Sequence, residues 1–196
     1  IPAKDKSMRY SSEHKALTRE KLLNSSGAIA KQGGFSAAGV DGLMKAIGLT
    51  GGAFYSHFAS KNELFAAIVE RELQHSLQRL GDTAAGGRDK LQRCLDIYLS
   101  MAHVTQAESG CAIPALGAEI ARADLPVREQ AEHWLLRLQN AWAEVLQDED
   151  LAWAALAQCV GALLLARMLA SPERQEQVLN ASKQLLHNAI QGERQT

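Results

Sequence analysis

The segment from Gly34 to Leu64, GFSAAGVDGLMKAIGLTGGAFYSHFASKNEL, constrains the fold more than any other part of the chain. Its pattern predicts, in order, a short helix from Gly39 to Ile47, a turn at Gly48-Leu49, a second short helix that opens at Thr50, and a further helix that starts at Ser60. Two short helices joined by a glycine turn form a helix-turn-helix, whose second helix lies on DNA. Two ordinary surface helices would give the same pattern, so geometry alone leaves both interpretations open.

The residue types within this segment favour a nucleic-acid interface. An apolar face predicts that the first short helix packs in a core, with Val40, Leu43, Met44 and Ile47 recurring at steps of three and four residues. Gly48 supplies the left-handed conformation that ends this helix, and Thr50 is placed to cap the next one. The second helix is poor in charge and rich in small residues and short hydrogen-bond donors, which suits close approach to a phosphate backbone.

The residues of the segment resemble, in order and spacing, the signature of TetR-family transcriptional regulators. The matching residues are Gly34-Phe35, Gly48-Leu49-Thr50, Phe54-Tyr55-Ser56-His57-Phe58 and Ser60-Lys61-Asn62-Glu63-Leu64, with Thr18-Arg19, Leu22-Leu23 and Ile29 upstream. The resemblance implies an all-α chain, with an N-terminal three-helix helix-turn-helix DNA-binding domain at residues 15–75 and a C-terminal helical effector-binding and dimerisation domain at 76–196. Beyond residue 75 the resemblance is only architectural, so it names no effector.

The resemblance also implies which residues contact DNA. The family's DNA-facing positions fall on Thr50, Gly51, Gly52, Tyr55, Ser56 and His57. Gly51 departs from the family, which often has Arg or Lys there to read a guanine edge. Base readout then depends on Lys45, on an apolar contact from Ala53, or on DNA shape.

Ser60 and Glu63 form a predicted capping box at the start of the next helix. Lys61 adds a positive charge to that positive helix end, which is unfavourable unless an anion lies there, so we expect Lys61 to bind a DNA phosphate. The helix before the segment is expected to run from about Ser12 or Thr18 to Gln32, with Thr18 as its N-cap. Three basic residues near its leading end, Arg9, Lys15 and Arg19, either reach DNA or form a solvated face.

The formal net charge of −1 hides an asymmetry along the chain. Residues 1–61 hold nine Lys and Arg against four Asp and Glu, a net charge of +5, while residues 62–196 hold twelve against eighteen, a net charge of −6. A basic N-terminal part attracts polyanions and an acidic remainder repels them. The charge pattern therefore agrees with a DNA-binding N-terminal part.

The C-terminal two thirds predict a helical body with a cavity. We expect loops at Gly81–Gly87 and at His103–Gly110, and a long helix that starts at Pro126. The candidates to line an effector cavity are Tyr98, Met101, Cys111, Trp134, Leu138 and Trp142. For any single one of them, an ordinary core position is the stronger interpretation.

The last two predicted helices carry excess apolar surface. The run from Leu151 to Ala170 has a charge-free stretch, Leu151 to Ala166, that is shorter than the ~20 residues a bilayer demands, so we expect a buried helix that is apolar nearly all round. Ser171-Pro172-Glu173 starts the final helix, whose predicted seam is Val178, Leu179, Leu185, Leu186 and Ile190. Two such helices suggest a four-helix bundle between two subunits, and hence a homodimer on a palindromic site.

Several other classes of function find no support in the sequence. There is no GxSxG, HExxH or Walker loop, no cofactor motif, and no His/Cys pair with metal-ligand spacing, so neither an enzyme nor a metalloprotein is expected. Three cysteines without a CxxC pair and the lack of an apolar leader favour a reducing, cytoplasmic location. The IPAKDKS stretch before Met8 is treated as an extension outside the fold.

The sequence therefore predicts a ligand-responsive repressor that binds double-stranded DNA as a homodimer and is released by a small molecule. A ligand-binding or adaptor protein that kept the fold and lost specific operator binding is the alternative, motivated by Gly51 and by the poor helix-forming stretch Ser25-Ser26-Gly27. Cys111 is either an electrophile or oxidant sensor or an inert buried thiol.

Overall fold

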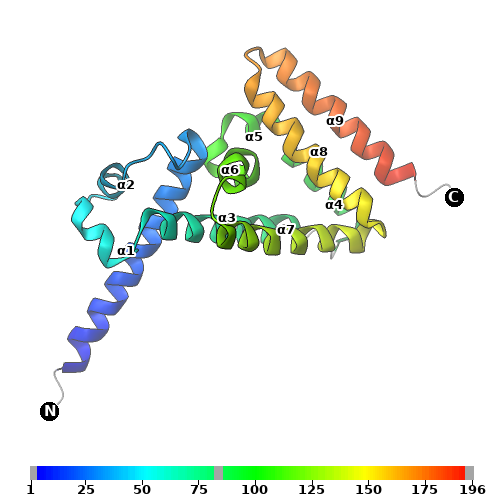
Figure 1. Ribbon diagram of the computed structural model, residues 1–196. Helices are drawn as coiled ribbons and strands as arrows, with labels where there is room; N and C mark the ends of the chain where they lie inside the picture. Colours follow the sequence, from blue (N-terminus) through cyan, green and yellow to red (C-terminus); the bar gives the residue numbers. More distant parts are fainter. Residues whose placement is uncertain (1–3, 82–85, 193–196) are drawn as a thin grey trace.

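The computed structural model describes residues 4–81 and 86–192, with side chains from residue 13 onward. Its elements are α1 (Lys4–Gly33), α2 (Val40–Ala46), η1 (Gly51–Ser56), α3 (Lys61–Gly81), α4 (Gly87–Tyr98), α5 (Met101–Thr105), η3 (Ala107–Ser109), α6 (Ala112–Ala121), α7 (Leu125–Leu146), α8 (Glu149–Met168) and α9 (Pro172–Gly192). The described residues contain helices and turns but no strand, which confirms the all-α class (Figure 1). Below, the head is α1, α2, η1 and the start of α3, and the body is the remainder.

The first helix is longer than the sequence predicted. Because α1 begins at Lys4, Thr18 lies inside the helix, and its Oγ1 donates a hydrogen bond to the carbonyl of His14 at 2.9 Å. A threonine in a helix interior commonly bonds back to the carbonyl four residues earlier in this way. The predicted helix start, and the role of Thr18 as an N-cap, are therefore wrong, whereas an end near Gln32 is confirmed.

The helix-turn-helix forms where the sequence placed it. Helix α2 is followed by Gly48 at φ 76°, the left-handed conformation that a side chain at this position would strain. The next helix, η1, is a 3-10 helix rather than an α-helix, and Thr50 precedes it without making a side-chain cap. Its hydroxyl therefore does not satisfy the amides that it was predicted to cap.

The start of α3 shows the predicted capping box with a shift of one residue. The backbone N–H of Glu63 donates to Ser60 Oγ at 3.1 Å. In return the carboxylate of Glu63 accepts from the N–H of Ala59 at 2.7 Å, and not from Ser60. The two side chains still stabilise the helix start by satisfying amides that the helix leaves without partners.

Helix α3 joins head to body. It packs along α7 in the body, while its first half contributes Leu64, Phe65 and Ile68 to the head core (Figure 1). The proposed boundary between residues 75 and 76 falls inside this continuous helix, and the division into two domains stays a prediction. Helices α6 and α7 also reach into the head core, with Leu116 and Val127. Head and body therefore share packed helices.

The segment from His103 to Gly110 is not the loop that was predicted. It forms α5 and η3, and Ser100 caps α5 by accepting a hydrogen bond from the N–H of His103. Hydrogen bonds of short helices satisfy this segment's backbone locally, so it can pass close to α1 and form part of a cavity wall.

Helix α8 is not buried all round, contrary to expectation. One side packs on α7 and α9, while its apolar side chains Trp153, Leu164, Leu165 and Met168 are between 43 and 72% exposed. In helix α9, Leu179, Leu186 and Ile190 pack into the core of their own chain, and Leu185 is the exposed residue of the predicted seam, at 56%. The outward apolar surface thus lies mainly on α8.

By length and composition alone, α8 is also the one helix among the described residues that is long and apolar enough to cross a membrane. A core helix of a soluble protein passes the same test, so this feature is weak evidence for a membrane span.

A buried ion pair connects α1 to α3. Lys31 Nζ lies 2.8 Å from Glu72 Oε2, with both side chains nearly inaccessible, and Nζ also donates to the carbonyl of Gly110 at 3.3 Å. Gly27 makes room for this pair, because a Cβ there would lie 3.1 Å from Glu72 Oε1. Gly27, a weak helix former, is therefore the position at which the Glu72 carboxylate packs against α1.

Removing one member of this buried pair should destabilise the protein strongly. We expect Lys31→Met to lower the free energy of unfolding by about 3 to 5 kcal/mol, because it leaves Glu72 buried without its cation. The exposed pair Arg71–Glu20, with the same 2.8 Å separation, provides the control: Arg71→Met should cost less than about 1 kcal/mol. Urea unfolding followed by circular dichroism measures both, and equal losses would contradict the assignment.

Candidate nucleic-acid interface and body pocket

Helix η1 presents most of the predicted DNA-binding residues to solvent. Phe54 and Phe58 are fully buried in the head core and fix the helix from below. The outward residues are Thr50, Gly52, Tyr55 and Ser56, all exposed, together with Lys45 on α2; Gly51 and His57 are half-buried. The two buried rings therefore orient a surface of small residues and hydroxyl groups that can approach a phosphate backbone closely.

Arg19 of α1 holds the end of this surface. Its guanidinium stacks over the Phe58 ring, 3.8 Å from the centroid, and donates a hydrogen bond to the carbonyl of His57. The cation–π contact and the hydrogen bond together fix both the ring and the backbone. Arg19, expected either to reach DNA or to be solvated, is instead a positioning residue for η1.

The carboxylate of Asp41 lies where a side chain on residue 51 would begin. A Cβ built on Gly51 would lie only 1.8 Å from Asp41 Oδ1, so any side chain there requires the carboxylate to move. Asp41 is exposed and stands beside the start of η1, where it places a negative charge on the predicted DNA-facing side. No sequence pattern predicts this contact, because the two residues meet only through the helix-turn-helix geometry.

Lys61 has partners within the protein. Its Nζ donates to the carbonyl of Ser36 at 3.0 Å and lies 4.9 Å from the centroid of Phe35. These contacts join the start of α3 to the turn after α1. A phosphate contact by Lys61 remains a prediction and would need this lysine to leave or share the Ser36 carbonyl.

The surroundings of His57 favour its neutral form in the free protein. Burial lowers its pKa most, and the nearby charges of Lys15, Arg19 and His14 lower it further. Its Nδ1 is buried without a hydrogen-bond partner. A cluster of positive charge around an imidazole favours an anion there, because a phosphate would offset the repulsion that disfavours the protonated ring.

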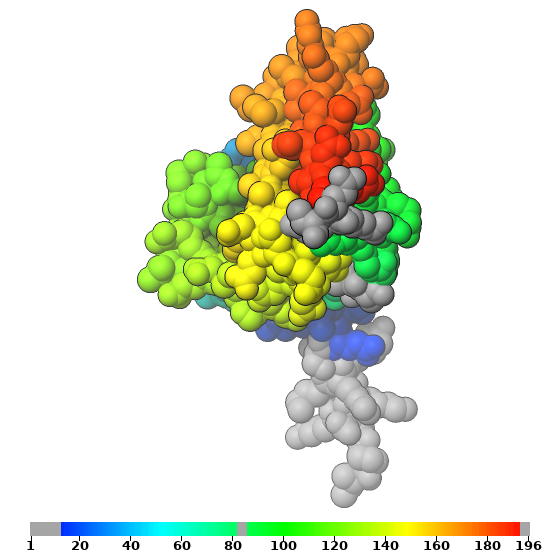
Figure 2. All heavy atoms as spheres, turned by 90° about the vertical axis from the view of Figure 1, so that its right-hand side faces the viewer, coloured from blue at the N-terminus to red at the C-terminus, as the bar shows by residue number. Residues whose placement is uncertain are grey.

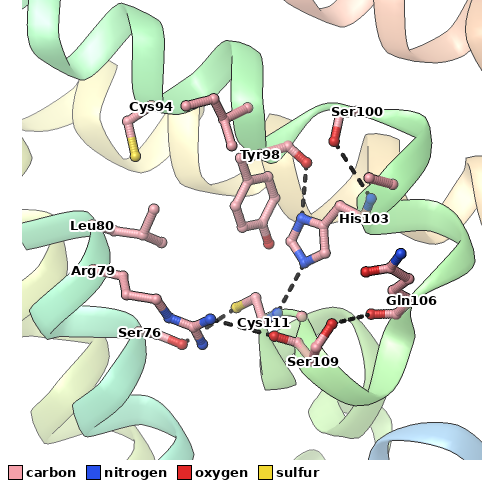
Figure 3. A pocket seen from close by; sticks show the side chains of 13 residues that line it. Ser76, Arg79, Leu80, Cys94, Tyr98, Ser100, His103, Gln106, Ser109 and Cys111 are labelled. Atoms are coloured by element: carbon pink, nitrogen blue, oxygen red, sulfur yellow. Dashed lines mark hydrogen bonds between the residues drawn. The ribbon is translucent and has the colours of Figure 1, made fainter.

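A cavity of about 370 Å³ opens in the body between α3, α4, α5 and the start of α6. Its described lining combines apolar side chains with hydrogen-bonding groups: Ser76, Arg79, Leu80, Cys94, Ile97, Tyr98, Ser100, Ala102, His103, Gln106, Ser109, Gly110 and Cys111 (Figure 3). Cavities of this size and mixture take small organic molecules.

His103 organises the wall of this cavity. Its Nδ1 lies 2.8 Å from the carbonyl of Tyr98, and its Nε2 accepts from the N–H of Cys111 at 2.9 Å (Figure 3). A carbonyl only accepts, so Nδ1 carries the proton and the ring is neutral. Burial is the largest cause that lowers the pKa of His103, which agrees with this state. The imidazole thus ties α4 to the start of α6.

The predicted cavity residues divide between wall and core. Tyr98 and Cys111 line the cavity, whereas Leu138 and Trp142 are buried in the body core, where Trp142 Nε1 donates to the carbonyl of Leu80 at 3.1 Å. Met101 packs against the same core, and Trp134 packs against the head core. Aromatic composition did not separate cavity from core, and Arg79 and His103 were missed because only the fold brings them together.

Cys111 is buried in the cavity wall and precedes α6 as its N-cap residue. Its Sγ lies 3.5 Å from Ser76 Oγ. His103 accepts from the backbone N–H of Cys111 and is therefore not oriented as a base for the thiol. The structure leaves both the sensor and the inert interpretation open as predictions.

Two contacts connect the cavity to the head. Gly110, in the cavity wall, accepts from Lys31 of α1. Farther along α6, the Glu119 carboxylate accepts from the N–H groups of Phe35 and Ser36, both at 2.8 Å, and from Ser36 Oγ at 2.6 Å. Helix α6 therefore begins at the cavity and ends at the turn that follows α1.

Comparison with known proteins agrees with this geometry. The family model for bacterial regulatory proteins of the TetR family matches residues 22–68, the segment that contains α2, η1 and the start of α3. The head of the chain therefore matches the helix-turn-helix of the TetR family. The TetR-family match covers the helix-turn-helix and stops before the cavity.

The chain matches curated relatives over only part of their length. It is 30% identical over 69 residues to the HTH-type transcriptional regulator UidR of Escherichia coli, covering 35% of each chain. It is 31% identical over 107 residues to the HTH-type transcriptional repressor NemR of Escherichia coli, covering 53% of this chain and 54% of the relative. The aligned region thus spans about a third to a half of these relatives.

Solved structures of TetR-family proteins share the whole architecture. The reduced form of NemR from E. coli superposes with a TM-score of 0.71 at 22% identity, covering 88% of this chain and 96% of that one. A TetR transcriptional regulator from Legionella pneumophila gives 0.75 at 19% identity, with 89 and 97% covered. At these identities the likeness shows the fold alone, including a helical body behind the helix-turn-helix.

DNA binding by this TetR-family head should strengthen as the pH falls. The pKa of His57 is lowered in the free protein, and a neighbouring phosphate would raise it, so binding takes up a proton between the two values. We expect affinity to rise several-fold between about pH 8 and about pH 6 at constant ionic strength, measured by fluorescence anisotropy. His57→Gln should lose most of this dependence, and an unchanged pH slope in that variant would exclude His57 as its source.

Proposed function

We propose that this chain is a DNA-binding transcriptional regulator in the cytoplasm, acting as a homodimeric repressor of a palindromic operator that a small-molecule effector releases. The observation that carries the proposal is the exposed surface of η1, which the buried Phe54 and Phe58 anchor to a basic head. Relatives matched over the head are named as transcriptional regulators and repressors, which supports the same function. None of the features described calls for catalysis.

Release would act through α6. An effector in the cavity would press on the wall at Gly110 and Cys111, which lie between Lys31 of α1 and the start of α6. Movement of α6 would be passed to the head at Glu119, which holds the turn at Ser36. An effector that binds the DNA-free arrangement better than the DNA-bound one lowers DNA affinity by that difference, typically ~1–3 kcal/mol.

The adaptor alternative has one specific observation in its favour. Asp41 occupies the space beside Gly51 where the TetR family often has a basic base-reading residue. A carboxylate at this place repels phosphates and cannot bind a guanine edge as Arg does. A protein with this feature could keep the fold and lose sequence-specific binding.

Selection from a random duplex pool separates the two functions. We expect enrichment of a palindrome, with log K falling by ~0.9 for each phosphate contact as log salt rises. Tyr55, which is 68% exposed on η1, should bind a phosphate, so Tyr55→Phe should weaken binding to all enriched sequences about equally. Recovery of no palindrome would favour the adaptor function, and a changed base preference in Tyr55→Phe would contradict a phosphate role.

Dimerisation is proposed through the outward face of α8 together with α9. The two helices lie side by side on one face of the molecule (Figure 2), and the exposed apolar residues there include Leu164, Leu165, Met168 and Leu185. A second copy of the chain, packed symmetrically, would remove this surface from water and form a four-helix bundle.

A charge on this face should prevent dimerisation without unfolding the chain. Leu165 is 54% exposed, so Leu165→Glu should yield folded monomers in sedimentation experiments, because burying the carboxylate in a dimer costs several kcal/mol. Leu186 of the predicted seam is only 3% exposed within its own chain, so Leu186→Glu tests the core instead and should unfold the protein. A Leu165→Glu dimer would place the interface elsewhere.

A further inference from the structure

The charge in the lining of the body cavity is positive. Among the described residues that line it, Arg79 is charged and positive, and none is Asp or Glu. Arg79 comes from α3, and its guanidinium points toward Ser109 and Cys111 (Figure 3). Among the described residues, Arg79 makes one hydrogen bond, from its NH1 to the carbonyl of Ser109, and this bond is long at 3.3 Å. A guanidinium has five N–H donors in a planar fork, so this contact leaves most of them to bind a ligand.

A second guanidinium lies behind the wall. Arg167 of α8 is half-buried and donates to the carbonyl of His103 at 2.7 Å, while its Nε is buried without a partner. Burial lowers the pKa of Arg167, while Tyr98 and Cys111 in the wall, and the Glu108 carboxylate outside the cavity lining, raise it. For neither Arg79 nor Arg167 do the described residues supply a carboxylate within ion-pair distance.

Other parts of the cavity wall also favour an anion. Cys111 is the N-cap of α6, a helix of ten residues, so the positive end of that helix dipole meets the cavity next to Arg79. Ser100 supplies a hydroxyl donor, because its Oγ accepts from the N–H of His103, whereas the Ser76 hydroxyl on the opposite side (Figure 3) donates to the carbonyl of Glu72. His103 adds no charge, because its hydrogen bonds require the neutral ring.

Another part of the lining is apolar. Leu80 and Cys94 lie on the far side of Tyr98 from Gln106 in Figure 3, and Ile97, also in the lining, is 74% exposed. A ligand that fills the cavity therefore meets both a positive charge and hydrocarbon. Two guanidinium charges without carboxylate partners disfavour a cationic ligand and favour an anionic one.

We propose that this cavity binds a small organic acid, in which Arg79 holds the carboxylate or comparable anionic group and the hydrocarbon part lies over Leu80, Cys94 and Ile97. The inference rests on the proposed function, since the cavity is taken as the effector site of the regulator. It also gives the effector a physical action: an anion on Arg79 competes with the Ser109 carbonyl, one residue before the Gly110 carbonyl that Lys31 holds.

Three probes with one hydrocarbon body test the charge preference. The full chain is titrated by calorimetry with 4-phenylbutyrate, 4-phenylbutanamide and 4-phenylbutylamine, which differ only in the charge and hydrogen bonding of the head group. We expect the acid to bind at least about tenfold more tightly than the amide, and the amine to bind most weakly. Equal binding of acid and amide, tighter binding of the amine, or no heat from the acid at millimolar concentration would overturn the proposal.

Variants assign the preference to Arg79. Arg79→Gln should bring the acid within about twofold of the amide, and Arg79→Lys should keep part of the preference because the charge remains. Arg128→Gln, on the exposed side of α7, is the matched control and should change nothing. A preference for the acid that survives in folded Arg79→Gln would overturn the role of Arg79.

The same preparations, tested for DNA binding without any probe, distinguish the two levels of inference. Specific DNA binding with no preference for the acid would refute the ligand class and leave the regulator intact. Absence of specific DNA binding would refute the proposed function, while the acid preference would still be decided by the titrations.

Discussion

The ion pair between Lys31 and Glu72 is the contact on which the relation of head to body depends. It joins α1 to α3 in a nearly inaccessible environment, and the same lysine reaches the carbonyl of Gly110 in the cavity wall. A buried charge without its partner is very unfavourable, so breaking this ion pair would cost about 3 to 5 kcal/mol. The head is therefore connected to the cavity wall through a buried ion pair.

Helix α6 provides the second tie, and it acts at a different place. Its first end lies in the cavity wall at Cys111, and its other end holds the turn after α1 through three hydrogen bonds to the carboxylate of Glu119. Burial by itself would raise the pKa of Glu119, but these three hydrogen bonds and the nearby charge of Arg122 bring it below its ordinary value. Two separate contacts thus fix the head in orientation as well as in position, which a single contact could not do.

The predicted DNA-facing surface is positioned by buried side chains rather than by charge. Phe54 and Phe58 anchor η1. The guanidinium of Arg19 contacts the Phe58 ring and the His57 carbonyl instead of pointing outward. Asp41 beside Gly51 further reduces the positive charge at the start of η1. The basic character of the head therefore surrounds η1, and the helix itself offers small residues and hydroxyl groups.

The sequence by itself determined the all-α class, the helix-turn-helix at residues 39–58 and the capping box at Ser60, because helix periodicity, a left-handed glycine and a cap are local properties of consecutive residues. It could not determine that Thr18 lies inside a longer helix, that Leu186 faces its own core, or that Trp142 is core while His103 and Arg79 line a cavity. Those outcomes depend on which helix faces pack together. Tertiary structure decided them, because contacts between residues far apart in the chain, such as Lys31 with Glu72 or Gly51 with Asp41, leave no periodic trace in the sequence.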